Sequence, residues 1–179
     1  MRDVLIRMAH QNAWANHRLA NAIAQLDDAA YKLATRTSFF PSIHLTLVHI
    51  LFVDRYYADA LEDGGLGRAV FDDEDRFARD ESHAETRAQQ RAIDQRLIAI
   101  TQAIELDKPT RIPRADHVQV EKAHDVLLHV FEHQIHHRGQ VHAMLAGTSV
   151  EPPQLDEFFL AAELPLRAAE LTELGLPLR

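Results

Sequence analysis

The chain has 179 residues, 46% of them hydrophobic, which fits one domain with a sizeable core. Its 27 acidic residues outnumber 19 basic ones, and this balance argues against a general nucleic-acid-binding protein, which needs clustered Lys and Arg. The chain contains no cysteine, so disulfides, thiolate metal ligands and a cysteine nucleophile are excluded. Because no apolar run approaches the roughly 20 residues of a membrane span, and no signal-peptide core is present, we expect a cytoplasmic protein without a membrane partner.

The first half of the chain has the period of two amphipathic helices. The face of the first helix consists of Leu5, Met8, Asn12, Ala15, Leu19, Ile23 and Leu26. Asn12 interrupts this face with a polar side chain. Ser42 is a suitable cap for a second helix, predicted from about Ile43 to Glu62 and stopped by Gly64 and Gly65. Its inward stripe includes Leu45, His49, Phe52 and Tyr56.

In the middle of the chain the residue pattern indicates a solvated connection followed by a third helix. The acidic run from Phe71 to Glu81 is interpreted as a solvated connection. Ser82 and Glu85 match a capping box, which predicts that the third helix starts there. Pro109 and Pro113 are expected to end it.

The remaining segments complete an all-α prediction. Residues 110–121 give only a weak signal for a short extended piece, and a fourth helix is predicted from about Lys122 to Ala146, stopped by Gly147. The tail opens on prolines suited to a helix start and contains Pro165, so we expect one or two short helices. Four long helices with short connections predict a four-helix bundle. Residues 1–179 form a single domain in this interpretation, with 152–179 as a helical extension packed on it.

Histidines are concentrated in the fourth predicted helix. Its inward stripe consists of Val126, Val130, His133, His137, Val141 and Met144. His133 and His137 therefore occupy positions that would otherwise be apolar. Residues four apart lie roughly 40° apart around a helix axis, one turn above the other, so both imidazoles can reach one ion. His136 points roughly 100° away from its neighbour and does not share that geometry.

A third histidine helps to decide whether the pair binds a metal or is a hydrogen-bonded part of the core. Two histidines at this spacing are consistent with either interpretation, but His49 also lies on the inward stripe of another helix. Burying three imidazoles without partners would be costly, so their convergence favours a metal ion. Three neutral imidazoles suit zinc, nickel, copper or iron(II) and leave coordination positions open.

Two other metal motifs fit less well. The metalloprotease pattern H-E-x-x-H needs a glutamate after the first histidine, whereas Gln134 follows His133. A di-iron carboxylate bundle needs two E-x-x-H motifs, and we find one, from Glu121 to His124. Neither class is favoured.

Four segments together carry a family resemblance: "NAWANHRL", "FFPSIHLTLVHILFVDRYYADAL", "HVFEHQIHHRGQVHAML" and "GTSVEPPQLDEFF". They resemble the DinB (damage-inducible) family, part of the DinB/YfiT-like metalloenzyme superfamily, over nearly the whole chain. The resemblance implies an up-down-down-up four-helix bundle and a homodimer. It also implies a metal held by His49, His133 and His137. We expect a divalent ion, with zinc or nickel favoured over iron or manganese. The apolar run "LTLVHILFV" in the second helix is a further reason to expect a homodimer.

Three functions are compatible with such a site. Relatives in the family include bacillithiol- and mycothiol-dependent S-transferases and a thiol-dependent maleylpyruvate isomerase, so the resemblance implies activation of a low-molecular-weight thiol. An open three-histidine site can lower the pKa of a bound thiol or of a bound water. We therefore predict metal-dependent thiol S-transfer, with metal-dependent hydrolysis or a non-catalytic metal-binding stress protein as alternatives.

Further polar and aromatic residues have two interpretations each. Asp54 is expected to form a salt bridge, with Arg55 or a neighbouring helix, or else to support the site, and Asn12 either approaches the site or stays structural. Arg138 either clamps an anionic substrate or joins an ion pair between helices. Gln140 either contacts a metal-bound water or is a buried structural amide. We expect the following residues to pack or to lie at the surface or around the site: Trp14, Tyr56, His129, His136 and His142.

Overall fold

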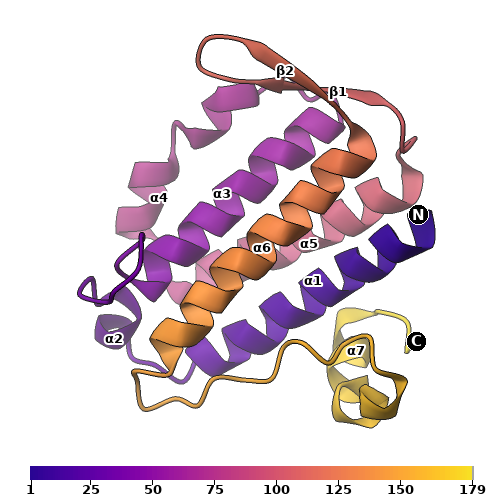
Figure 1. Ribbon diagram of the computed structural model, residues 1–179. Helices are drawn as coiled ribbons and strands as arrows, with labels where there is room; N and C mark the ends of the chain where they lie inside the picture. Colours follow the sequence, from indigo (N-terminus) through magenta and orange to yellow (C-terminus); the bar gives the residue numbers. More distant parts are fainter. Residues whose placement is uncertain (179) are drawn as a thin grey trace.

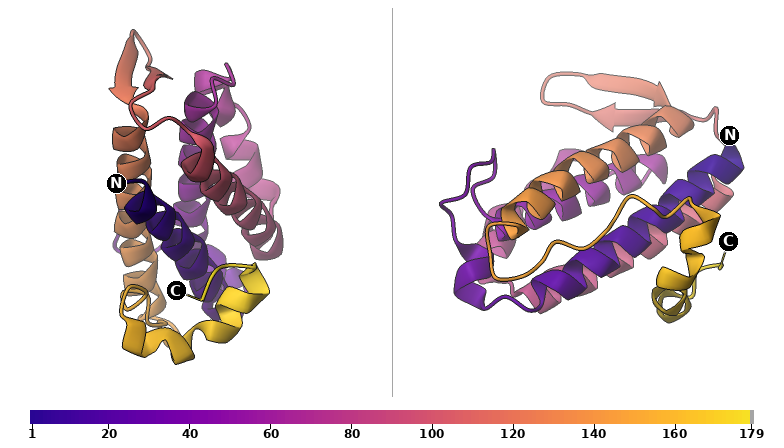
Figure 2. Two further views of the ribbon diagram at one scale, coloured as in Figure 1. Left: turned by 90° about the vertical axis from the view of Figure 1, so that its right-hand side faces the viewer. Right: turned by 60° about the horizontal axis from the view of Figure 1, so that its bottom comes forward.

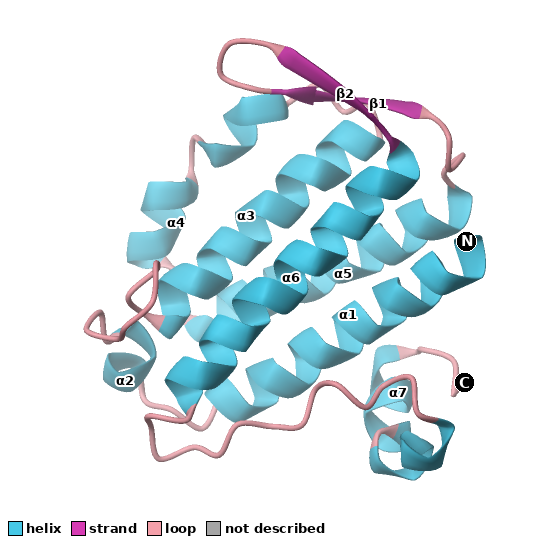
Figure 3. Cartoon of the chain, viewed as in Figure 1, coloured by secondary structure: helices cyan, strands magenta, loops and turns pink. Residues whose placement is uncertain are grey.

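Four long helices form the body of the molecule. The computed structural model describes residues 1–178, and its long helices are α1 (Arg2–Ile23), α3 (Ile43–Leu61), α5 (His83–Ala103) and α6 (Ala123–Leu145) (Figure 1). Helix α1 packs against α5 and α6, and α3 packs against the same two helices. Figure 1 shows α1 and α6 running in one direction and α3 and α5 in the other. The predicted all-α class is confirmed (Figure 3).

Apolar side chains fill the space between these helices. On α1, Leu5, Leu19 and Ile23 from the predicted face are almost fully buried. Burying such a side chain contributes about 1.5–3 kcal/mol. Asn12 is buried on the same face, so it needs polar partners inside the protein. No helix within residues 1–178 is both long and apolar enough to cross a membrane.

The helix starts follow the predicted caps. The Ser42 hydroxyl accepts a hydrogen bond from the backbone N–H of Leu45 at 3.1 Å. Both halves of the capping box between Ser82 and Glu85 are present at the start of α5. The end of α5 was predicted too late, because the helix stops at Ala103, well before Pro109, and the chain continues in extended conformation at Ile104.

A hairpin stands where the sequence indicates an extended piece only weakly. Strands β1 (Pro109–Pro113) and β2 (Val118–Lys122) pair antiparallel, with Pro109 opposite Lys122 and Pro113 opposite Val118. Proline cannot donate to a neighbouring strand, and a two-stranded hairpin places it at an edge where that donor is not needed. Ile112 points into the core and anchors the hairpin.

The segments between the long helices contain more helix than predicted. The acidic run, interpreted as a solvated connection, contains the helix α4 (Glu74–Asp80), and the short helix η1 (Gly67–Phe71) ends at its first residue. Phe77 is buried against Phe52 with ring centroids 5.5 Å apart, while the acidic side chains around it face solvent. A short helix α2 (Asp28–Lys32) also precedes α3. Phe77 and a hydrogen bond between the His44 ring and the backbone carbonyl of Ala78, at 2.7 Å, both join α4 to α3.

The C-terminal part runs back along the long helices. The prolines at 152 and 153 do not start a helix, since the chain stays extended there, and the short helices η2 (Ala161–Leu166) and α7 (Ala168–Leu174) come later. Figure 2 shows the extended segment crossing the molecule to reach α7 beside α1. The expectation of one or two short C-terminal helices is confirmed.

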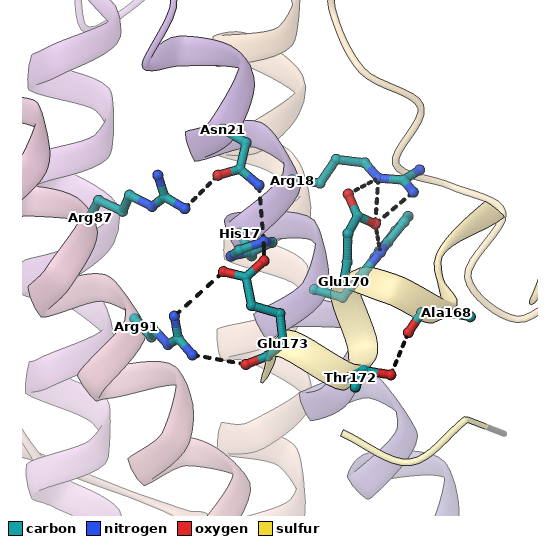
Figure 4. A network of polar contacts seen from close by, with 10 residues as sticks. His17, Arg18, Asn21, Arg87, Arg91, Ala168, Glu170, Thr172 and Glu173 are labelled. Carbon is teal, nitrogen blue, oxygen red and sulfur yellow. Dashed lines mark hydrogen bonds and ion pairs between the residues drawn. The ribbon is translucent and has the colours of Figure 1, made fainter. Parts of the chain in front are cut away.

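Polar contacts hold α7 in place (Figure 4). Glu170 accepts hydrogen bonds from the indole N–H of Trp14 at 2.7 Å and from the Arg18 guanidinium at 2.6 Å. Glu173 lies 3.4 Å from the His17 ring, and its backbone carbonyl accepts a hydrogen bond from Arg91 at 3.1 Å. Helix α7 is thus joined to both α1 and α5.

Candidate metal centre

Three histidine side chains from two helices meet between α3 and α6. One ring nitrogen of each of His49, His133 and His137 lies within 4.8 Å of a nitrogen of the other two. The Nε2 atoms of His49 and His133 are 3.0 Å apart. Two nitrogens on one tetrahedral zinc ion lie about 3.3 Å apart, given zinc–nitrogen bonds of about 2.0–2.1 Å. Small side-chain adjustments would therefore let this group hold a metal ion.

Apolar neighbours on α6 direct two of the imidazoles inward. Val130 and Val141 are fully buried on the same stripe, one before and one after the histidine pair. His137 is itself 8% exposed, and His133 is half-buried. Because residues four apart share a helix face, burial of the valines orients the histidines toward α3.

An aromatic side chain covers part of the group. Phe40, from the loop before α3, stacks on the His49 ring with centroids 4.4 Å apart and lies 5.9 Å from the His137 ring. The His49 and His137 rings are 4.7 Å apart and nearly perpendicular. Phe40 therefore covers one face of the His49 ring and lies near the His137 ring.

Burial keeps these imidazoles neutral. Desolvation, together with the neighbouring His137, lowers the pKa of His49 from 6.5 to about 4. Desolvation and the surrounding histidines lower the pKa of His133 to about 3. Desolvation also lowers the pKa of His137, although its hydrogen bond to Gln140 acts in the opposite direction. A neutral imidazole has the free lone pair that a divalent metal requires.

Gln140 orients one of the three rings. Its Oε1 lies 2.8 Å from Nδ1 of His137, so this nitrogen carries the proton and Nε2 keeps its lone pair. Its Nε2 lies 3.1 Å from the ring of His136. Second ring nitrogens of metal-binding histidines are commonly held in this way. Gln140 is half-exposed, so the alternative of a buried structural amide is wrong.

The contacts of His133 are those of a ligand more than of a core histidine. Its Nδ1 is buried and has no hydrogen-bond partner within residues 1–178. Its Nε2 faces another imidazole instead of a carbonyl or carboxylate. Two neutral imidazole nitrogens that face each other can both bind one divalent ion through their lone pairs. The facing Nε2 atoms of His49 and His133 therefore fit a metal ion better than a structural hydrogen-bond network.

Comparison with known proteins identifies the family. The model of the DinB family matches residues 1–167, which include all three histidines. The chain belongs to the DinB family. Protein DinB of Bacillus subtilis (strain 168) is 25% identical to it over 158 residues, covering 85% of this chain and 91% of that protein. No solved structure matches the chain.

Asp54 of this DinB-family chain does not form the expected salt bridge. Its Oδ2 accepts hydrogen bonds from the side-chain amides of Gln90, at 2.8 Å, and Gln134. Arg55 points elsewhere and donates to Gln89. Asp54 is fully buried, and burial raises its pKa well above the usual range, with nearby Asp94 adding to this effect.

Arg138 and Asn12 belong to the same buried network. The Arg138 guanidinium donates from Nη1 to the side-chain oxygens of Asn12, Asn16 and Gln134, the last two at 3.0 Å. Arg138 therefore bonds to side-chain amides and does not form the ion pair between helices that was one of its two interpretations. Asn12 donates to Asp94 at 3.2 Å, so its side chain is used here and not at the histidines.

The two aromatic candidates pack as expected. Trp14 is buried against Phe158, with ring centroids 5.4 Å apart. Tyr56 is buried at the other end of the molecule, where its hydroxyl donates to the carbonyl of Pro113. Neither ring is among those in contact with His49, His133 or His137.

Three further histidines of α6 were expected at the surface or around the site. His129 and His136 are exposed, and the His129 ring is 6.3 Å from that of His133. The His142 Nε2 lies 3.1 Å from the carbonyl oxygen of Pro153 in the C-terminal segment. His142 thus fastens that segment to α6.

Two residues that matter at the site were not singled out by sequence. Phe40 lies in a loop without periodicity, so no pattern in the sequence could indicate that it stacks on His49. Gln134 follows His133 on the buried face, and its polar character in an apolar environment is the signal that identifies it.

The main cavities of the described residues do not open directly onto the three histidines. Among the five main cavities within residues 1–178, none is lined by His49, His133 or His137. A cavity of about 240 Å³ begins one helical turn away, at His129, and extends to Tyr57 and Arg114. Phe40 occupies space on the other side of the group.

Proposed function

We propose that His49, His133 and His137 bind one divalent metal ion and that the chain is a metal-dependent enzyme. The observation that carries this proposal is the convergence of three neutral imidazoles from α3 and α6 within 4.8 Å. Three nitrogen ligands suit zinc or nickel best, with iron or manganese as further candidates. Such a ligand set leaves at least one coordination position open for another molecule.

The reaction we propose is transfer of a group to a small thiol. When bound, the metal supplies a Lewis acid that stabilises thiolate over thiol near neutral pH. The chain contains no cysteine, so the thiol must come from a low-molecular-weight cosubstrate. The three imidazoles and Phe40 limit access of water to this position, which protects a nucleophile from competing protonation.

The cavity at His129 supports this proposal because it can hold a polar molecule. Its walls include Arg114, Gln119 and Tyr57 together with the acidic side chains of Glu121 and Asp125. Arg114 lies over the Tyr57 ring, 5.9 Å from its centroid, and donates to Gln119 at 3.0 Å. Walls that carry both a guanidinium and carboxylates suit a peptide-like thiol that has both carboxylate and amino groups.

Elemental analysis and a cobalt titration test the proposal. Protein purified without a histidine tag should contain about one divalent metal per chain. The cobalt form, titrated with glutathione, bacillithiol, mycothiol and simple thiols, should develop a sulfur-to-metal charge-transfer band with one of them. That band should be lost in the His137→Ala variant. Absence of any bound metal, under metal-replete conditions, would overturn the proposal.

The same titration separates the alternatives. If no thiol gives a band while esters or amides are cleaved in a metal-dependent reaction, the site is hydrolytic. If metal binds but no substrate is turned over, the chain is a non-catalytic metal-binding protein of the stress response. Metal-free protein as the control attributes any turnover to the ion.

We also expect the chain to form a homodimer. The family resemblance supports this expectation, whereas the apolar run of α3 does not, because Ile50, Leu51 and Phe52 are buried within one chain. Light scattering at micromolar concentration should give twice the mass of the chain. A monomer under those conditions would contradict the expectation and leave the metal site unaffected.

A further inference from the structure

A buried polar network connects all four long helices beside the histidine group. Asp54 of α3 accepts hydrogen bonds from Gln90 of α5 and Gln134 of α6. Gln134 in turn accepts a bond from Arg138 at 3.0 Å. Asp94 of α5 accepts bonds from Asn12, Asn16 and Gln90 at 2.9–3.2 Å.

This network is costly for a structural core. Asp54 and Gln134 are fully buried, and Arg138 is 3% exposed. The second oxygen of Asp54 is buried without a hydrogen-bond partner within residues 1–178. Apolar side chains of similar size often stabilise a core as well or better. Directional hydrogen bonds differ from apolar packing because they also fix how one helix is rotated against another.

The network partners on α6 adjoin the proposed metal ligands in sequence. Gln134 follows His133 and Arg138 follows His137, so each network side chain is turned about 100° from an imidazole on the same helix. Fixing the direction of the network side chains therefore fixes the direction of the imidazoles. An imidazole nitrogen about 6 Å from the helix axis moves by about 1 Å when the helix rotates by about 10°. Metal ligands tolerate errors of about 0.2 Å.

Resting on the metal centre proposed above, we propose that Asp54 is a positioning residue for this centre. Through its bond to Gln134, it sets the rotation and height of α6 against α3 so that His133 and His137 meet His49. Asp54 lies five residues after His49, which provides a second attachment between the same two helices more than one turn away. Contacts at two points along a pair of helices fix their relative position, whereas a single contact still allows one helix to rotate about it.

Matched substitutions test this role. Asp54→Leu removes its hydrogen bond to Gln134 of α6 together with the one to Gln90 of α5. Asp54→Asn keeps an oxygen acceptor in the same place, and Asp94→Leu disrupts the network on α5, which carries no proposed ligand. The Asp54→Leu variant should bind zinc about 10–100-fold more weakly and change the visible spectrum of bound cobalt. Asp54→Asn should restore most of the affinity. Asp94→Leu should lower the melting temperature but weaken zinc binding far less than Asp54→Leu, because its direct hydrogen bonds go to α1 and α5 and it is linked to Arg138 of α6 only through Asn12 and Asn16.

A second readout works without metal. In the metal-free chain, ring protons of His49 and His133 should show a nuclear Overhauser effect that Asp54→Leu abolishes and Asp94→Leu retains. If Asp54→Leu does not fold, Gln134→Met removes the same bond between α3 and α6 while Asp54 keeps its bond to Gln90, and it should behave alike. Equal effects of the Asp54 and Asp94 variants on both readouts would overturn the positioning role. Failure of the parent chain to bind metal would instead overturn the proposed function, and the ring-proton measurement would still decide the role of Asp54.

Discussion

The Nε2 atoms of His49 and His133 lie 3.0 Å apart, although 84 positions separate the two residues in the chain. Without a metal, one of these nitrogens must donate its hydrogen to the other, because two lone pairs at this distance repel. Protonating both rings would place two positive charges side by side in a desolvated site. The pair is therefore suited to share a cation other than a proton.

Replacing a single ligand should release the metal. We expect His49→Ala, His133→Ala and His137→Ala each to reduce the metal content from about one ion per chain to a trace, because two imidazoles bind far more weakly than three. Elemental analysis after gel filtration measures this directly. His136→Ala is the control, since its exposed ring lies next to the group without belonging to it. Full metal content in any of the three variants would remove that residue from the ligand set.

The metal-free chain should become less stable below neutral pH. The pKa values of His49 and His133 are about 4 and about 3 in the folded chain, against 6.5 for an ordinary histidine. At these two rings the unfolded chain therefore binds more protons than the folded chain between pH 6.5 and about 3. The stability that they contribute is complete above pH 6.5 and falls as the pH is lowered through this window, whereas the raised pKa of Asp94, about 6, acts in the opposite direction.

Urea unfolding at a series of pH values measures this dependence. The His133→Gln variant, which has no titrating ring at that position, should show a shallower loss than the parent chain. Zinc should also compete with protons for the same nitrogens, so occupancy should fall as the pH drops below about 6. Metal binding that is flat between pH 8 and pH 5 would contradict ligation by histidine.

Gln140 should matter for metal affinity more than for stability. Its oxygen accepts the Nδ1 proton of His137 at 2.8 Å and holds the ring in one tautomer. We expect Gln140→Ala to weaken zinc binding about tenfold, the lower end of the usual effect of losing such a partner. Competition with a chromophoric chelator measures the affinity. Gln140→Glu, which retains the acceptor, is the matched control and should bind zinc at least as tightly as the parent chain.

Glu170 should anchor the C-terminal helix. Its carboxylate accepts hydrogen bonds from Trp14 at 2.7 Å and Arg18 at 2.6 Å and is 24% exposed. Removing it leaves two donors without their acceptor, and we expect Glu170→Ala to lower the free energy of unfolding by about 1–2 kcal/mol. Trp14 is the chain's one tryptophan, so its fluorescence reports on this contact. As a control, Glu151→Ala at an exposed position should change neither the free energy of unfolding nor the fluorescence of Trp14.

Much of the helical framework could be predicted from sequence. The start of α3 at Ile43 and the capping box of α5 were predicted from local hydrogen-bonding groups that act within one turn. The grouping of His49 with His133 and His137 was predicted because all three interrupt apolar stripes. Local caps and the period of a helix are properties of neighbouring residues, so the chain itself encodes them.

The sequence did not predict which side chains the helices bring together from afar. Asp54 meets Gln134 across 80 positions, and Arg138 meets Asn12 across 126, and no local pattern specifies either pair. Phe40 and the helix α4 depend in the same way on surfaces that exist only after the long helices have packed. Periodicity determines which face of a helix is buried. The partner that a buried polar group finds there depends on the rotation and height of the neighbouring helices, which the packing of the whole core decides.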